Sequence, residues 1–592
     1  MRWLACFLVV AGCAAADAPL ASVPTLSSIA PQIVVPGSTL VIRGTGFTGD
    51  GSSLHVVGTA GGAPFDRTWA ATLVDAGTLT VALDGSLGSV DLLGTATVTD
   101  GGTTSAPLPV SISARTQLAP SIATLQTGAI FVADAVAVTG DGFLLGGAEG
   151  TTSARITGCI ARGDACEPIA PQAVPLAATS RTQATFGFGP SIAGVAPGTF
   201  TGTIALVNGS VASPPVPVVY VLVPPQVTAL SPPSASLGQY VFVRGGGFAG
   251  VTELELAGTL GGTPVDVVLV PEVVSGRLAR YVVDADDALG GATGHFSGTI
   301  TPIVTYGDQR VVGPPLAAAL DLAPTKQVVY VNLTPAFVAE LADFGLRGLD
   351  GPVRDRILHV VREAYRGVNV ELRTEPPADF ARYTQIDLVG VDPNAEGLLG
   401  YDAGPTKDDG NQRLDDRLGG VSSSVQPDGF PGFGGVFLRS FFAFSTHPAP
   451  FGAVTLAADP AFDAIFDPLR AHPADAADVA AFAPLGTPST CPSRDRRARV
   501  SCAVFVLGNL VGDTVAHELG HALGLANPYA DGFHDAGDAP DRLMDAGGAR
   551  PFRERAQLGA GPARFCAAEL AYLRSILPTA EPAADLARPP CD

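Results

Sequence analysis

The spacing of apolar and polar positions divides the chain into two regions of different character. Up to about residue 322, short runs alternate apolar and polar side chains, as in Thr39–Arg43 and Tyr240–Arg244. A period of two residues is typical of strands that bury one face. From residue 325 onward, strand-like runs cover 327–333, 368–372 and 386–389, and an amphipathic helical pattern covers 353–366. The pattern predicts an all-β region followed by an α+β region.

One motif occurs three times in the all-β region. Each copy begins at a proline and ends 23 residues later at the phenylalanine of a Gly-x-Gly-Phe step, over 24–47, 120–143 and 225–248. The glycines predict a turn that needs left-handed dihedrals. The motif resembles that of IPT/TIG domains, and the resemblance implies three all-β immunoglobulin-like sandwiches at 24–112, 119–222 and 224–322. Such domains serve as spacers or as modules that bind glycans or proteins.

The first 16 residues have the form of an export signal, with Arg2 before a short apolar run and small residues after it. The run Val10-Ala11-Gly12-Cys13 resembles a bacterial lipobox, which implies that Cys13 is acylated and anchors the protein in the cell envelope. Cleavage after Ala16, which would release a secreted protein, is the alternative. No later segment is expected to span a membrane, so the lipid anchor is the expected membrane contact.

Six cysteines follow the export signal, and an even number suits an oxidising compartment. They fall into three local pairs, which predict three disulfide bonds: Cys159 with Cys166, Cys491 with Cys502, and Cys566 with Cys591. No pair has the spacing of a zinc ribbon.

Composition and charge exclude some classes of protein and of partner. Of the 592 residues, 46% are hydrophobic and 15% are charged, a composition too apolar for a disordered chain. The 71 glycines and 50 prolines favour short strands and tight turns over helical bundles. A net charge of -21 repels phosphate backbones, so no nucleic-acid partner is expected.

One motif in the α+β region points to catalysis. His517-Glu518-Leu-Gly-His521 follows an apolar run of helical periodicity that starts near Asn509. On a helix, positions 517 and 521 share a face, so both imidazoles can reach one Zn²⁺ ion. Zinc acidifies water and polarises a carbonyl, and Glu518 is placed to move the proton of that water to a leaving amine. The expected reaction is hydrolysis of a peptide bond in a polypeptide substrate.

Two further residues narrow the class of hydrolase. Gly524 follows His521 by three residues, and Met544 is the only methionine besides the initiator. The region then resembles the metzincin zinc proteases, whose pattern is H-E-x-x-H-x-x-G-x-x-H followed by a methionine-containing turn. The resemblance implies that His517 and His521 are zinc ligands, Glu518 the general base, Gly524 the turn after the helix and Met544 the methionine turn. It also implies an α+β metzincin-like catalytic domain at 325–592.

The third ligand departs from the family pattern, because Asn527 occupies its position. An amide oxygen is a poor zinc ligand. His534, seven residues later in a turn-rich loop, is therefore the hypothesised third ligand, with Asp531, Asp535 and Asn527 as alternatives. A degenerate site that binds no metal also stays open.

A thermolysin-like site would take its third ligand from a later helix, where Glu554 and Glu569 are available. Gly524 and the single internal methionine favour the metzincin pattern instead.

Two other segments are candidates for supporting roles. The stretch 392–416 is rich in acidic residues and glycine and is a possible Ca²⁺ site, although its spacing is not that of an EF-hand and a solvated loop is the simpler interpretation. The segment 434–440 is expected to form a strand that borders the cleft or belongs to the interior of the sheet.

The sequence thus predicts an exported, lipid-anchored zinc endopeptidase with three immunoglobulin-like modules as a stalk. Two alternatives stay open: a surface adhesion protein with a vestigial metal site, and an amidase that acts on cell-wall peptides.

Overall fold

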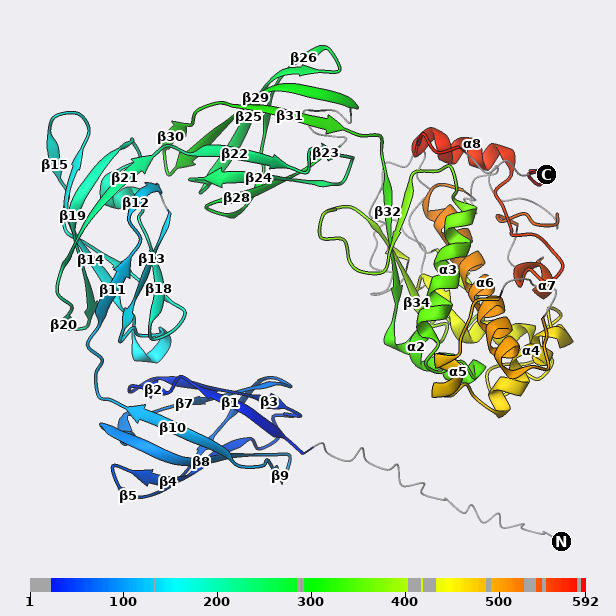
Figure 1. The fold of residues 1–592 in the computed structure, drawn as a ribbon, viewed down its shortest axis with the longest axis horizontal. Helices are drawn as coiled ribbons and strands as arrows, with labels where there is room; N and C mark the ends of the chain where they lie inside the picture. Colours follow the sequence, from blue (N-terminus) through cyan, green and yellow to red (C-terminus); the bar gives the residue numbers. More distant parts are fainter. Residues whose placement is uncertain are drawn as a thin grey trace, which may run out of the picture. The chain divides into compact units, whose positions relative to one another are not determined.

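The computed structural model describes residues 23–132, 134–284, 289, 292–402, 417–418, 433–485, 491–525, 539–545, 550–582 and 587–591. Contacts divide the chain into two units, which are described separately: residues 1–226 with 246–251 and 304–313, and residues 227–245 with 252–303 and 314–592. Figure 1 shows sheets through the first half of the sequence and most of the helices near the C-terminus.

The first repeat folds as two antiparallel sheets that share one core. One sheet has the order β1 (Thr25–Ala30), β3 (Thr39–Thr45), β7 (Thr78–Ala82) and β6 (Thr72–Asp75). The other has the order β2 (Ile33–Val34), β10 (Leu108–Ala114), β8 (Val90–Asp100), β4 (Ser53–Ala60) and β5 (Ala63–Ala70), with β9 (Thr103–Thr104) on β8. Alternate side chains of both sheets, such as Leu40, Ile42, Leu54 and Val56, meet in one buried cluster. The repeat is therefore a β-sandwich.

The second repeat has the same strand order. Its first sheet runs β11 (Ser121–Leu125), β13 (Ala135–Asp141), β18 (Gln183–Gly187) and β17 (Ala177–Ala178). Its second runs β12 (Gly128–Phe131), β21 (Val216–Val223), β19 (Gly198–Asn208), β14 (Ser153–Ala161) and β15 (Cys166–Pro168). The additional strands β16 (Gln172–Pro175) and β20 (Val211–Ala212) pair with β14 and β19, and a short helix, α1 (Pro190–Ala193), precedes β19.

The third repeat repeats this order again. Its first sheet runs β22 (Gln226–Ser231), β24 (Tyr240–Gly246), β28 (Leu278–Val282) and β27 (Glu272–Ser275). Its second runs β23 (Ser234–Ala235), β31 (Leu316–Leu322), β29 (Gly294–Tyr306), β25 (Val251–Leu260) and β26 (Thr263–Leu269), with β30 (Gln309–Val312) on β29. The predicted immunoglobulin-like sandwiches are thus confirmed as a fold class.

The Gly-x-Gly-Phe step has the same geometry in all three repeats. Its second glycine has a positive φ, +78° at Gly46, +75° at Gly142 and +77° at Gly247. The phenylalanine that follows is buried in each repeat, at Phe47, Phe143 and Phe248. The step is therefore a turn that only glycine adopts without strain and that places an aromatic ring in the core.

The C-terminal region contains one mixed sheet. Its order is β33 (Val370–Arg373), β32 (Gln327–Leu333), β34 (Thr384–Val389), β37 (Gly435–Phe437) and β35 (Gly400–Tyr401), and β36 (Arg417–Leu418) also pairs with β34. All pairings are parallel except that of β35 with β37. The antiparallel strand β35 is the outermost strand on its side among those that the structure describes.

The helices of this region are α2 (Pro335–Glu340), α3 (Asp350–Ala364), α4 (Pro460–Ala471), α5 (Ala476–Ala480), α6 (Arg496–Ala522), α7 (Phe552–Arg555) and α8 (Ala567–Ile576). Helices α3 and α6 lie side by side in Figure 1, and their apolar side chains belong to one core with those of β32, β34 and β37. The predicted strand over 434–440 is too long. It ends at Phe437, because the chain then winds into a 3-10 helix, Leu438–Phe444, that buries Leu438, Phe441, Phe442 and Phe444.

Helix α6 corrects the expectation that no segment after residue 16 has the length and hydropathy of a membrane span. Its most apolar window has a mean hydropathy of 1.4, but all of that window is buried inside the protein. Helix α6 is therefore the core helix of the C-terminal region.

All three predicted disulfide bonds are present. Cys159–Cys166 joins β14 to β15, and Cys491–Cys502 joins the segment before α6 to α6 itself. Cys566–Cys591 joins the start of α8 to the last described residues. Disulfides of this number are typical of proteins that fold outside the reducing cytosol, so the protein is an exported one.

Candidate functional site

The site is built on the last turns of α6. The carboxylate of Asp495 caps the start of this helix by accepting from the backbone N–H of Ala498. Gly524, with φ +96°, follows its end, and the backbone N–H of Leu525 donates to the carbonyl of Gly520 over 2.8 Å. This geometry fits the predicted role of Gly524 as the turn after the helix.

His517 and His521 are held by backbone carbonyls. The Nδ1 of His517 lies 2.8 Å from the carbonyl of Leu543, and the Nδ1 of His521 lies 2.9 Å from that of Leu525. A carbonyl only accepts, so each Nδ1 carries the proton and donates. Burial and the neighbouring His521 lower the pKa of His517 well below its ordinary value, which favours the neutral imidazole. Both Nε2 atoms therefore present lone pairs.

The two Nε2 atoms converge on one point, 3.0 Å from each other. Two Nε2 ligands at about 2.05 Å from one tetrahedral zinc ion are about 3.3 Å apart. The imidazoles therefore fit a shared zinc ion, and the carbonyls of Leu543 and Leu525 fix their orientation from behind.

Met544 lies directly beneath this part of α6. It is fully buried, and a Cβ added at Gly520 would come within 2.7 Å of its Sδ. Gly520 therefore lets the methionine turn approach the helix between the two histidines. The ion pair of Arg542 with Asp545, both fully buried, closes the same turn.

Glu518 lies against the backbone of the antiparallel strand β35. A Cβ added at Gly400 would lie 2.5 Å from Oε1 of Glu518 and 2.7 Å from Cγ2 of Thr514. A side chain at position 400 would therefore displace the Glu518 carboxylate. The sequence gives no local signal for this contact, because 118 residues separate the two positions.

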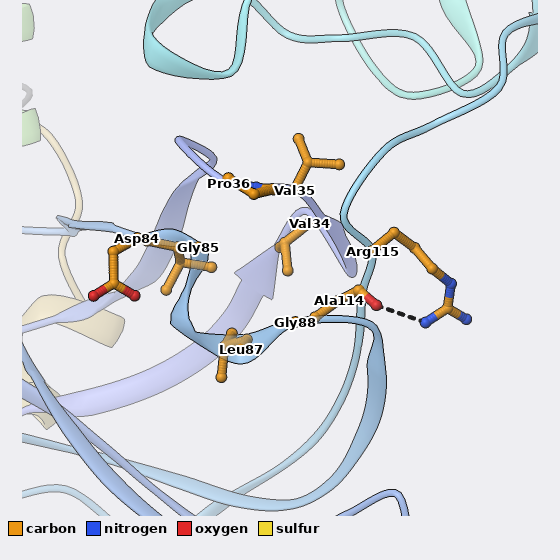
Figure 2. Close-up of a pocket in the computed structure, with 10 residues that line it drawn as sticks. Val34, Val35, Pro36, Asp84, Gly85, Leu87, Gly88, Ala114 and Arg115 are labelled. Carbon is orange, nitrogen blue, oxygen red and sulfur yellow. Dashed lines mark hydrogen bonds between the residues drawn. The ribbon is translucent and has the colours of Figure 1, made fainter. Parts of the chain in front are cut away.

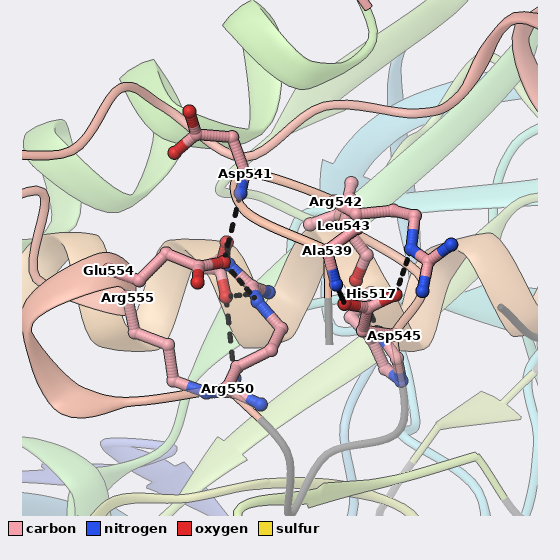
Figure 3. A network of polar contacts seen from close by, with 10 residues as sticks. His517, Ala539, Asp541, Arg542, Leu543, Asp545, Arg550, Glu554 and Arg555 are labelled. Carbon is pink, nitrogen blue, oxygen red and sulfur yellow. Dashed lines mark hydrogen bonds and ion pairs between the residues drawn. The ribbon is translucent and has the colours of Figure 1, made fainter. Parts of the chain in front are cut away.

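A buried network of charges supports the site one helical turn before His517 (Figure 3). Asp513 accepts from Arg550 Nη1 over 2.6 Å and from Arg555 Nη1 over 3.3 Å, and Arg550 Nε lies 3.1 Å from a carboxylate oxygen of Glu554. Burial and the neighbouring Arg550 lower the pKa of Arg555 to about 10. The network ties the segment after the methionine turn to α6.

The structure shows the contacts of Glu554 and Glu569, the two candidate ligands of the thermolysin-like alternative. Glu554 belongs to the network just described and accepts from the backbone N–H of Asp541 over 3.2 Å. Glu569 accepts from the backbone N–H of Cys566 over 2.8 Å at the start of α8. Both carboxylates thus make contacts that stabilise local structure.

Several predicted residues lie outside the described part of the chain. These are Asn527, Asp531, His534 and Asp535 of the third-ligand loop and Cys13 of the lipobox. The acidic stretch is described only in part, and there Asp392 accepts from three backbone N–H groups, those of Asn394, Glu396 and Leu398. These bonds close a turn, and the Ca²⁺ site stays a prediction.

Two hollows lie elsewhere on the described part of the chain. The first, on the first sandwich, lies between Pro36, Leu87 and Arg115 (Figure 2) and has a volume of about 10 Å³, the room of a single water molecule. It is too small for a ligand. The second lies between α3 and α6 and has a volume of about 520 Å³.

No protein-family model and no curated protein matches the chain. Solved structures found similar include the extracellular region of plexin A4 (9% identity, 52% of this chain, 34% of that chain, TM-score 0.21) and the FN1–FN3 domains of chicken CNTN1 (9%, 51%, 99%, 0.16). A third is SGBP-B from a xyloglucan utilization locus of Bacteroides uniformis (14%, 50%, 99%, 0.20). The chain spans about a third of the length of the plexin chain. TM-scores this low add nothing to the sheet order as evidence for the fold, and none of the three supports a peptidase.

Replacing Asp513 with Asn should destabilise the C-terminal region strongly. Two buried arginines would each lose an ion pair with this carboxylate, and removing one partner of a buried ion pair costs about 3–5 kcal/mol. Circular dichroism at 222 nm during urea titration reports on this region, because the long helices that the structure describes lie in it.

The matched control is Asp467→Asn. Asp467 also pairs with an arginine, Arg470, at 3.1 Å, but its side chain is 44% exposed. The expected cost is below about 1 kcal/mol. Equal effects of the two substitutions would contradict the structural role of the Asp513 network.

Proposed function

We propose that the chain is a zinc endopeptidase that hydrolyses peptide bonds of proteins outside the cytoplasm. The observation that carries the proposal is the convergence of two Nε2 atoms at 3.0 Å, each imidazole being fixed by a backbone carbonyl on its Nδ1. Such pairs, oriented from behind, are typical of metal ligands. The fit of Gly524 and Met544 to the methionine-turn pattern supports the same class.

The residues of the chain have separate roles in this proposal. His517 and His521 would hold the ion, which when bound acidifies water and polarises the scissile carbonyl. Glu518 would take a proton from the attacking water and deliver it to the leaving amine. The guanidinium of Arg555 lies near enough to Glu518 for the two opposite charges to attract each other.

Strand β35 is the proposed place for the substrate backbone. It lies against Glu518 at Gly400 and pairs through Gly400 and Tyr401 with β37 on one side. A substrate backbone held beside Gly400 would lie close to the Glu518 carboxylate. The strand predicted at 434–440 is not at the edge of the sheet, because β37 pairs with both β34 and β35.

A second candidate function is surface binding, and the structure supports it through the three sandwich domains. Such a protein would bind glycan or protein through these sandwiches. No comparison supports the peptidase. An amidase that acts on cell-wall peptides would use the same α6 residues. In each case, the proposed anchor is an acylated Cys13, with the sandwiches as a stalk.

Cleavage of casein by the full mature chain with added zinc is the first test. Glu518→Ala should lower the rate by at least about a hundredfold, because general acid–base catalysis contributes that much, and should leave zinc affinity unchanged. His517→Ala should abolish zinc binding as measured by dialysis and elemental analysis. A zinc-loaded wild type that cleaves neither casein nor peptidoglycan fragments would favour the binding protein.

The third ligand is proposed to be His534. In the same zinc-binding assay, His534→Ala should weaken affinity by at least about tenfold, which is the smaller end of the effect of losing a metal-site contact. Asn527→Ala should leave affinity within about twofold. The reverse order of the two variants would identify Asn527 as the ligand.

Gly400→Ala should slow cleavage by about a hundredfold, since displacing a catalytic group by about 1 Å has this effect. Zinc affinity should stay unchanged, because the atoms nearest to a Cβ at position 400 belong to Glu518 and Thr514. Gly452→Ala is the control, because a Cβ there has no atom within 4 Å. Full activity of Gly400→Ala would rule out the close contact between β35 and Glu518.

A further inference from the structure

A second cavity lies on the same helix as the proposed metal site and is independent of it. Its apolar walls are Val504 and Phe505 of α6, Pro352 of α3, and Phe482 and Leu485 of the loop before α6. Its volume of about 520 Å³ is in the range of small-molecule sites. Twelve residues of helix separate Phe505 from His517, a rise of about 18 Å.

Arg356 is the cation of this cavity, and its partners are neutral. Its Nε donates to Oδ1 of Asn509 over 2.6 Å, its Nη2 donates to Oε1 of Gln557 over 3.1 Å, and its guanidinium stacks on Phe505 at 4.4 Å. Within the described part of the chain, Nη1 has no partner and no carboxylate lies within ion-pair distance. Burial lowers the pKa of Arg356 to about 10, so the group is still charged at neutral pH.

The other titratable groups at the cavity do not neutralise this charge. Asp355 lines the rim, but its side chain is 73% exposed and lies 3.5 Å from Arg354. Glu363, whose charge acts on Arg356 from farther along α3, forms an ion pair with Arg366. His359 also lines the cavity, and burial and the Arg356 charge lower its pKa, so it is a neutral hydrogen-bonding group.

We propose that this cavity binds a small carboxylate with an apolar body. The carboxylate accepts from Nη1 of Arg356, and the apolar body packs on Phe505, Phe482 and Leu485. An anion supplies the negative charge that the amide partners of Arg356 lack, and a charge-assisted hydrogen bond of this kind is stronger than a neutral one. The apolar walls account for the rest of the affinity.

Calorimetric titration of the full mature chain with 4-phenylbutyrate and 4-phenylbutanamide tests the proposal, since the two probes differ only in the charged group. The acid should bind at least about tenfold more tightly than the amide, because hydrogen bonds to charged groups are that much stronger. Arg356→Gln should remove this preference and leave the amide affinity within about twofold. Equal binding of both probes, or no saturable binding of the acid, would overturn the proposal.

A second variant separates loss of the site from loss of the fold. Leu485→Trp fills the cavity from the loop, keeps Arg356 and its partners, and should weaken both probes by about tenfold or more. Glu518→Gln should leave both affinities unchanged, because Glu518 is distant from the cavity. If Leu485→Trp binds both probes like the wild type, the ligand lies elsewhere and the proposal is wrong.

Discussion

Helix α6 has a row of polar side chains along a face that is buried, and the arrangement of the C-terminal region depends on satisfying it. Asn509, Asp513, His517 and His521 follow one another at intervals of four residues, and the first three are fully or almost fully buried. A buried polar group without a partner costs several kcal/mol, so each position on this row requires a partner from elsewhere in the chain. The segment 542–557 supplies most of them.

Each of the three buried residues of this row has a partner in that segment. Asn509 donates to the carbonyl of Ala556, Asp513 binds Arg550 and Arg555, and His517 donates to the carbonyl of Leu543. The same row therefore positions the methionine turn, orients the first imidazole and, through Asn509, holds Arg356 at the wall of the second cavity. Packing of one helix thus determines the geometry at two separate places.

The parts of the fold that follow from local sequence were predicted well. The strand expected at 327–333 coincides with β32, and the helix expected at 353–366 is α3 at 350–364, because their apolar periodicities are regular. His517, Glu518 and His521 were predicted from their spacing on one helix, and α6 includes all three, while Gly524 and Met544 came from the family resemblance. The three disulfides were predicted because each closes a short loop.

Contacts between distant segments could not be read from the sequence. The start of α6 at Arg496 was missed because arginines and a disulfide occupy its first turns, whereas the apolar run begins later. Nothing near Asp513 indicates an arginine 37 residues away, and nothing near Gly400 indicates Glu518. The 3-10 helix after β37 was taken for a strand because its apolar residues begin inside a strand-like run. In each of these cases, the packing of the tertiary core determines which contacts the residue makes.

The orientation of the two histidines is the physical basis of the zinc proposal. Each Nδ1 is used as a donor to a carbonyl, so the Nε2 atoms are both acceptors, and two lone pairs at 3.0 Å repel each other. In the proposed site, a divalent ion would satisfy both lone pairs at once.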